Sequence, residues 1–120
     1  FNCVLCNSTL EHDKNFWKSI FEMRRVLKKK GLLIIGTPSY TVIKEPTNFM
    51  VKLLKLIKIK RSFLNSLVLS TLTHKIHNHP GDYYRFSEQT FKEVFFEGFK
   101  SISIKIIMIP PRAIGYGFKT

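Results

Sequence analysis

Acidic residues are scarce in this sequence of 120 residues, in which eight Asp and Glu stand against twenty Lys and Arg. The resulting formal net charge of +12 suits a nucleic acid, an anionic lipid surface or an anionic substrate as partner. Most of the excess is lysine spread over predicted helical faces, so a solubilising surface is the simpler interpretation. Apolar residues, by contrast, are plentiful. With 44% hydrophobic residues, the chain can form the core of one domain, so we do not expect it to be disordered.

Long apolar runs are also missing. No stretch reaches the roughly 18 to 20 unbroken apolar residues of a membrane-spanning helix, and the N-terminus lacks the basic-then-apolar order of a signal peptide. Cysteine is limited to Cys3 and Cys6, whose spacing places the two thiols on opposite faces of a strand. We therefore expect free thiols and a cytoplasmic protein.

The first forty residues predict a strand, a helix and a second strand. Apolar runs at residues 1–6 and 32–35 are typical of strands that are buried on both faces. Between them, apolar residues recur at helical spacing over residues 16–27. Asp13 is expected to cap this helix, and Gly31 to end it in the left-handed conformation. Because the connections are short, we expect a right-handed crossover between two parallel strands.

The middle of the chain predicts a helical insert. Residues 37–48 are rich in Pro, Ser and Thr and read as a loop. They lead into a basic amphipathic helix over residues 48–72, broken near Ser62, in which lysines alternate with Leu and Ile. Together with the loop that follows, this gives a helical, lid-like insert at about residues 42–80.

The last third predicts a loop, a short helix and two strands. Residues 73–86 form the loop, because Pro and Gly interrupt any regular element there. Ser87 is expected to open a helix that ends at Gly98. Isoleucines alternate with Ser and Lys over residues 100–108, which is typical of a strand. Residues 112–119 follow a tight turn and predict a last strand antiparallel to its predecessor.

Two separate stretches resemble the class I S-adenosylmethionine-dependent methyltransferases of the type 11 group. The first contains Leu-Glu-His at residues 10–12, Arg-Val-Leu-Lys at residues 25–28 with Gly31, and the apolar run that leads to Pro38. The second is the segment HPGDYYRF and the helix that leads to a Gly-Phe pair, at residues 79–99. The two matches occur in the order that the family has them.

This resemblance implies an α/β fold, a partial Rossmann-like methyltransferase sheet. Residues 1–120 would be the C-terminal part of the domain, with parallel strands, a C-terminal antiparallel strand and the helical insert. The four strands would lie in the order first, second, fourth, third. The first strand would then expose the edge at which the missing N-terminal half of the domain pairs.

The function that the resemblance implies is methyl transfer from S-adenosyl-L-methionine to a small-molecule or glycan-like acceptor. The family's Gly-rich turn and the acidic residue that holds the cofactor ribose lie outside the matched stretches. Gly115 and Gly117 do not replace that turn, because too few residues follow them to form a helix N-terminus. We therefore expect an incomplete cofactor site, in a fragment of a larger or truncated enzyme that is inactive alone.

Candidate cofactor and catalytic residues follow the first strand. By position, the resemblance assigns the methionine end of the cofactor to Asn7, with Cys6 and Ser8 as neighbours. An asparagine also suits a strand-to-helix turn for backbone reasons alone. His12 is a candidate general base, although Glu11 and His12 equally suit a capping role at the strand exit.

Candidate substrate-side residues lie in the second matched stretch. The resemblance assigns His79, Tyr83 and Arg85 to a segment that covers the active site. Arg85 equally suits a structural role as a buried cation paired with Glu88.

A metal site is not predicted. His74, His77 and His79 give an H-x-x-H-x-H pattern, and three histidines can hold zinc. Only Asp82 is close enough in sequence to complete the ligand set, so we interpret the pattern as part of a substrate-side loop.

The basic stretch at residues 48–61 leaves a second function open. It could lie on an anionic membrane surface as a peripheral contact, although packing over the sheet as a lid is the favoured interpretation. A specific nucleic-acid partner is not expected, because the sequence has no recognisable motif and no aromatic stacking platform. The alternative function is thus a non-catalytic basic α/β module that binds anionic membrane or nucleic acid.

Overall fold

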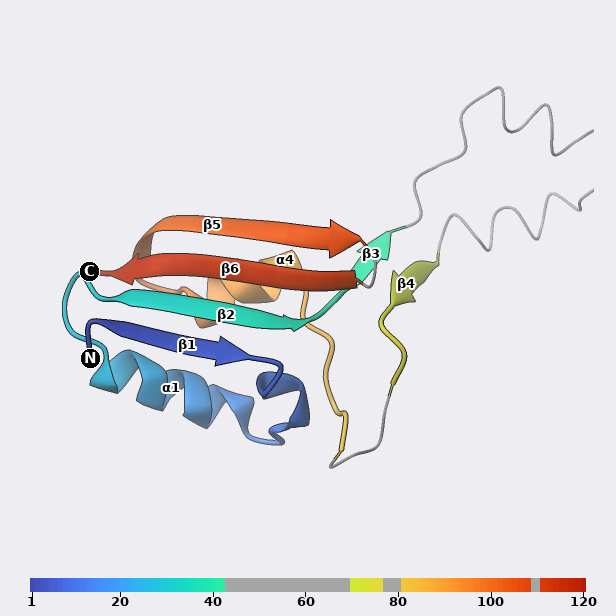
Figure 1. Ribbon diagram of the computed structural model, residues 1–120, viewed down its shortest axis with the longest axis horizontal. Helices are drawn as coiled ribbons and strands as arrows, with labels where there is room; N and C mark the ends of the chain where they lie inside the picture. The colour runs from blue at the N-terminus through green and yellow to red at the C-terminus, as the bar shows by residue number, and fades with distance from the viewer. Residues whose placement is uncertain (43–69, 77–80, 109–110) are drawn as a thin grey trace, which may run out of the picture. The chain divides into compact units, whose positions relative to one another are not determined.

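Four strands form a mixed sheet in the order β1-β2-β6-β5, and two helices accompany it (Figure 1). The computed structural model describes residues 1–42, 70–76, 81–108 and 111–120, and we use the element labels of Figure 1. The sheet belongs to a compact unit of Phe1–Tyr40 and Thr73–Thr120, while Thr41–Leu72 form a second unit. The four strands are β1 (Cys3–Asn7), β2 (Leu32–Pro38), β5 (Phe99–Met108) and β6 (Pro111–Lys119).

The predicted strand directions and order are confirmed. β1 and β2 are parallel, with Cys3 opposite Leu32 and Asn7 opposite Gly36. β6 is antiparallel to both β2 and β5, so β5 runs in the same direction as the parallel pair. The order first, second, fourth, third places β1 at one edge of the sheet. The main unit is therefore a small α/β domain with one parallel pair.

The first helix, α1 (Phe16–Val26), has the predicted period but different ends. Asp13 is not the N-cap: that position falls on Asn15, and Asp13 Oδ1 accepts a hydrogen bond from the Asn15 backbone at 2.8 Å. Gly31 does not take the left-handed conformation, which falls on Lys30 with a φ of 61°. A Cβ at residue 31 would lie 2.8 Å from the Leu27 side chain, so glycine is needed there for close packing.

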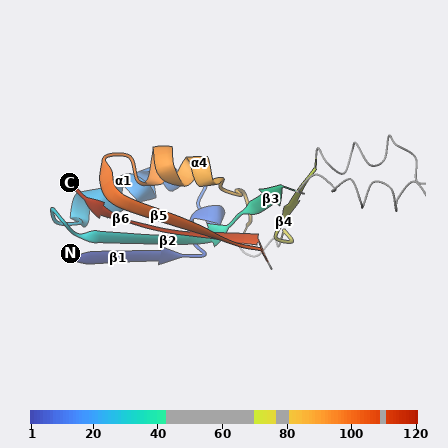
Figure 2. The same ribbon diagram turned by 90° about the horizontal axis from the view of Figure 1, so that it is seen from above.

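The second helix starts after Ser87 as predicted, and its last helical residue is Phe95, three positions before the predicted end at Gly98. It consists of α4 (Glu88–Thr90) and a π-helical turn, η2 (Phe91–Phe95). Ser87 Oγ accepts a hydrogen bond from the Thr90 backbone N–H at 3.0 Å, which caps the helix. Gly98 follows with a φ of +75°, a conformation that favours glycine. Figure 2 shows that α1 and α4 lie on the same face of the sheet.

The core lies between this face and the two helices. Gly115 allows the second helix to lie close to the sheet, because a Cβ at residue 115 would lie 2.8 Å from ring atoms of both Phe91 and Phe96. Ile104 and Ile106 of β5 pack against the same core, as their alternation predicts. The buried apolar residues are Cys6, Leu10, Ile20, Leu27, Leu33, Ile35, Phe86, Phe91, Phe95, Phe96, Phe99 and Ala113.

The opposite face, which we call the open face, is not covered by the residues that the structure describes (Figure 2). Leu5 is 68% exposed and Tyr116 is 44% exposed. The prediction that the first strand is buried on both faces is therefore wrong within the described residues, because both helices pack on one side. Strand register gives the open face Cys3 and Leu5 of β1, Leu32 and Ile34 of β2, Lys100, Ser103, Lys105 and Ile107 of β5, and Arg112, Ile114, Tyr116 and Phe118 of β6.

Two short strands correct the prediction for the middle of the chain. β3 (Tyr40–Val42) pairs with β4 (Thr71–Thr73) in a two-stranded sheet. Their Thr, Tyr and Val residues favour strands, so loop and helix were wrong at these positions. The predicted basic helix at 48–61, most of the insert at 42–80, and His77 and His79 lie outside the described residues. No helix among those described is long and apolar enough to span a membrane.

Candidate functional site

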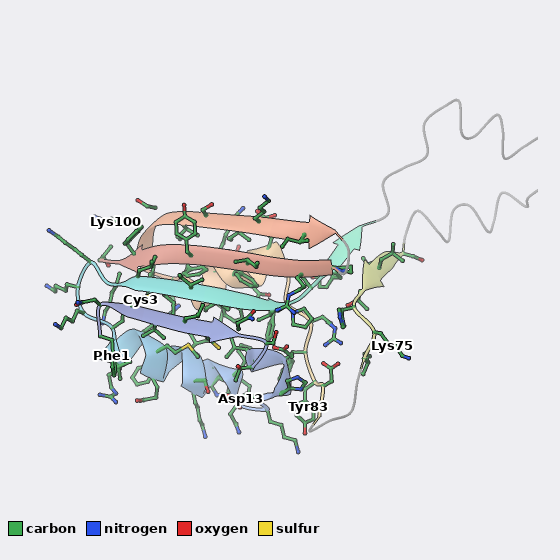
Figure 3. All side chains as sticks on the ribbon, in the orientation of Figure 1. Phe1, Cys3, Asp13, Lys75, Tyr83 and Lys100 are labelled. Atoms are coloured by element: carbon green, nitrogen blue, oxygen red, sulfur yellow. The ribbon has the colours of Figure 1, made fainter. Side chains whose placement is uncertain are left out.

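Several polar side chains gather where the parallel strands end. β1 ends at Asn7 and β2 at Pro38, and the antiparallel β6 begins beside them at Pro111. Figure 3 shows Asp13 and Tyr83 at this end of the molecule and Phe1 and Lys100 toward the other. Ligands in open α/β sheets bind outside the carboxyl ends of the parallel strands. This end of the sheet is therefore the candidate site.

Arg112 joins the last residue of β1 to the residue that follows the strand. Its Nη2 atom donates hydrogen bonds to Asn7 Oδ1 at 2.9 Å and to Ser8 Oγ at 2.7 Å. Sequence analysis predicted Asn7 and Ser8 as site residues but missed Arg112. The contact spans 105 positions in the chain, and only the order of strands in the sheet could have indicated it.

Gly36 allows this arrangement. It lies opposite Asn7 on the neighbouring strand, and a Cβ at residue 36 would lie 2.5 Å from Asn7 Oδ1. Ser8 adopts a φ of 51°, which is uncommon for a residue with a side chain, and its backbone N–H donates to the Gly36 carbonyl at 2.8 Å. The contact between Asn7 and Arg112 thus depends on the presence of glycine, which has no side chain, at residue 36 of β2.

Replacing Gly36 with alanine is expected to displace the Asn7 amide and break its bond with Arg112. The Asn7 amide is the end of a movable side chain, so the loss should be close to that of one hydrogen bond to a charged group, about 1.5–3 kcal/mol. Urea unfolding would measure the loss of stability, and the Arg112 Nε–Hε resonance would report the lost contact. An unchanged Arg112 resonance in the folded variant would contradict the role given to Gly36.

Cys6 does not share the site with Asn7. Successive strand residues point to opposite faces, and Cys6 lies in the core at 7% exposure while Asn7 is exposed. Burial raises the pKa of the Cys6 thiol, so the thiol stays protonated at neutral pH. Both cysteines are free, and Cys3 is exposed, as their spacing predicts.

Glu11 and His12 tie the site to the segment before the second helix. They belong to a short 3-10 helix, η1 (Leu10–His12). The Glu11 carbonyl accepts hydrogen bonds from Tyr83 N at 2.8 Å and from Tyr84 N at 3.3 Å, and His12 Nδ1 is hydrogen-bonded to the carbonyl of Gly81. Both residues therefore hold residues 81–84 against η1, in keeping with the structural interpretation of the pair.

The Glu11 side chain is buried with one carboxylate oxygen that accepts no hydrogen bond from the described residues. It is only 2% exposed, and its Oε2 atom has no hydrogen-bond partner among the described residues. The nearest ring nitrogen, His12 Nε2, lies 3.9 Å from the other carboxylate oxygen. A buried carboxylate oxygen without a partner is costly, so this position is a place where a ligand donor would be stabilised.

Arg85 is a structural cation, but its partner differs from the predicted one. Its guanidinium forms a two-pronged ion pair with Asp82, with Nη2 2.6 Å from Oδ2, and donates to the Tyr84 carbonyl at 2.8 Å. The hydrogen bond with Asp82 raises the pKa of Arg85. Glu88 instead pairs with Lys92 at 2.7 Å.

Of the two predicted substrate-side residues that the structure describes, Tyr83 is the accessible one. Its side chain is 48% exposed, and Lys14 Nζ lies 5.2 Å from the centre of its ring. His74 Nδ1 is hydrogen-bonded to the Lys75 carbonyl at 3.0 Å. Within the described ranges, no three His, Cys, Asp or Glu side chains gather as a metal site would require.

Neither protein-family models nor curated proteins give a match to this sequence. The chemistry of the site therefore rests on its residues. At the end of the two parallel strands, the guanidinium of Arg112, the amide of Asn7 and the hydroxyl of Ser8 form one cluster that can bind a polar ligand.

Proposed function

We propose that this chain is the C-terminal part of a methyltransferase domain that transfers a methyl group from S-adenosylmethionine to a small-molecule or glycan-like acceptor. The observation that carries the proposal is the strand order β1-β2-β6-β5, in which an antiparallel last strand lies between two strands of the opposite direction. The sequence resemblance implies this same order. Chance agreement is limited, because four strands can be ordered in many other ways.

The residues at the carboxyl end fit one part of the cofactor. Asn7 and Ser8 present an amide and a hydroxyl at the end of β1, where the resemblance puts the methionine end. A Gly-rich turn and a ribose-binding acid are not among the matched stretches, so the proposal needs a further segment to supply them. When bound, the cofactor supplies a methyl group already activated on sulfur, and transfer then depends mainly on alignment.

The described residues have defined tasks under this proposal. Asn7 and Ser8 orient the ligand, and Tyr83 offers an accessible ring and hydroxyl to the acceptor. Glu11 and His12 hold the segment that carries Tyr83 beside the residues that follow β1. A role for His12 as general base stays a prediction, since methyl transfer to an already reactive nucleophile needs no base.

The edge of the sheet supports a partner for β1. Among the strands that the structure describes, β1 pairs with β2 alone, and Leu5 on its open face is 68% exposed. An unpaired edge and an exposed apolar face are surfaces that proteins normally cover. We propose that the N-terminal part of the domain covers both, in a cytoplasmic protein, to which free cysteines are suited.

The alternative of a non-catalytic basic module receives less support. It depends on the net charge of +12 and on the predicted basic helix at 48–61, which lies outside the described residues. Binding to anionic vesicles or to RNA would have to survive high salt to support it, because purely electrostatic binding weakens steeply with salt.

Calorimetric titration of S-adenosylmethionine tests the proposed function. We expect the complete product of the gene to bind with a dissociation constant on the order of 1 μM to 1 mM, the usual range for enzyme substrates. Asn7→Ala should weaken binding, and Asn15→Ala should not, since Asn15 makes no side-chain cap bond. The 120-residue chain alone should not bind. No affinity in the complete, folded product would remove the proposal.

A further inference from the structure

Four arginines lie in the described part of the chain, and three of them are paired with carboxylates. Arg24 pairs with Glu97 at 3.4 Å, and Arg25 pairs with Glu22 at 2.8 Å. Arg85 pairs with Asp82. Arg112 forms no ion pair with any described residue and is held by two neutral oxygens instead.

Neutral partners fix a guanidinium without cancelling its charge. Arg112 uses a single nitrogen, Nη2, for both bonds to Asn7 and Ser8. Its Nη1 and Nε atoms have no hydrogen-bond partner in the ranges that the structure describes. Ser8 Oγ accepts from Arg112, so its own proton can still be donated, and the amide nitrogen of Asn7 is a further donor. The cluster therefore presents several donors and a full positive charge.

The open face of the sheet, on which Arg112 lies, carries positive charge and no negative charge in its described residues. Lys105 of β5 lies on this face opposite Ile114, two positions from Arg112 in β6, while Lys100 lies on the same face toward the other end of the sheet. No Asp or Glu occurs among the described residues of the face. An uncancelled guanidinium charge beside a hydroxyl and an amide that can donate suits an anionic oxygen group such as a carboxylate or phosphate, because hydrogen bonds to an ionised acceptor are stronger than those between neutral groups.

We propose that Arg112, with Asn7 and Ser8, is a receptor for an anionic oxygen group, a carboxylate or a phosphate, at the carboxyl end of β1. This proposal adds a binding site to the proposed function. The identity of the ligand depends on that function. Two molecules could carry the group: the methyl acceptor, which would then be an anionic compound, or the cofactor through its methionine carboxylate. The anion-binding property itself does not depend on methyl transfer.

Titration of the 15N-labelled chain with inorganic phosphate at constant ionic strength tests the receptor. The Arg112 Nε–Hε resonance should shift and saturate. Arg112→Gln should weaken phosphate binding by about 10- to 100-fold, as expected for a charge-assisted hydrogen bond. The affinity of Arg112→Lys for phosphate should fall between those of the wild type and Arg112→Gln. The matched control is Arg25→Gln, which removes the same charge from an exposed ion pair and should leave binding unchanged. Equal binding by Arg112→Gln and wild type, or equal losses in Arg112→Gln and Arg25→Gln, would overturn the proposal.

Two nucleosides distinguish the sources of the anion in the complete gene product. S-adenosylhomocysteine carries the amino-acid carboxylate and 5′-methylthioadenosine lacks it. If Arg112→Gln weakens only the former, the receptor holds the cofactor carboxylate. If it weakens neither while phosphate binding is lost, the receptor holds the acceptor. If neither nucleoside binds the wild type and phosphate binding still depends on Arg112, the proposed function fails and the anion site stands.

Discussion

Replacing Phe95 with alanine is expected to lower the free energy of unfolding by about 3–5 kcal/mol, the usual cost of removing a buried phenyl ring. Phe95 has no exposed surface, and its ring centre lies 4.9 Å from that of Phe91 and 5.0 Å from that of Phe86. It also contacts Phe16 of α1, so it joins the two helices. Since small domains are stable by only about 5–15 kcal/mol, a large part of the stability depends on this ring.

The neighbouring residue supplies the control. Val94 is 40% exposed on the same helical turn, and surface substitutions of this kind change stability by roughly 0.5 kcal/mol or less. Urea unfolding of Phe95→Ala and Val94→Ala, with equal slopes, would give the difference directly. Coincident unfolding midpoints for the two variants would show that the aromatic cluster does not hold the helices together.

The second large effect is expected for Asp82→Asn. The Asp82 side chain has no exposed surface and the Arg85 side chain is 12% exposed, so the variant leaves a buried guanidinium without its ion-pair partner. Breaking a buried pair in this way costs about 3–5 kcal/mol. The segment that bonds to the Glu11 carbonyl should loosen at the same time, and faster hydrogen exchange at the Tyr83 amide would report it.

An exposed pair gives the matched comparison. Glu97→Gln removes the carboxylate that faces Arg24, and Glu97 is 74% exposed. Exposed pairs contribute about 1 kcal/mol or less, and the Tyr83 amide should be unaffected. If Asp82→Asn were no more destabilising than Glu97→Gln, the two-pronged bond would not be what fixes residues 81–86.

Helices and strands could be predicted where their patterns involve residues that are close in the sequence. The period of α1, the serine cap at Ser87 and the alternation in β5 each depend on residues within a few positions of one another. The first two are confirmed, and the alternation holds for Ile104 and Ile106 but not before Ser103, where the register of β5 shifts and Ile102 is 37% exposed. The left-handed residue before β2 was misplaced by one position. Gly31 lies against the Leu27 side chain, so its lack of a side chain serves packing, and Lys30 takes the turn conformation.

Contacts between distant residues could not be predicted in the same way. The partner of Arg85 depends on where the second helix starts: because the helix starts at Glu88, that carboxylate faces Lys92 one turn later. Arg85 precedes the cap and turns back to Asp82. The bond between Arg112 and Asn7 requires β6 to lie beside β2. Only the resemblance indicated that strand order, and it did not indicate the pairing of side chains.

The directions of the outer strands have a practical consequence for measurements on this protein. β1 begins, and β6 finishes, at the end of the sheet remote from Asn7, where the Lys119 N–H bonds the Gly31 carbonyl at 3.0 Å. Figure 1 shows both chain ends there. In the 120-residue chain, a short tether at Phe1 or Thr120 should therefore anchor the molecule to a sensor chip with its polar cluster turned toward the flowing solution. Surface-based kinetics of small anions can then be recorded without the attachment chemistry obstructing the site.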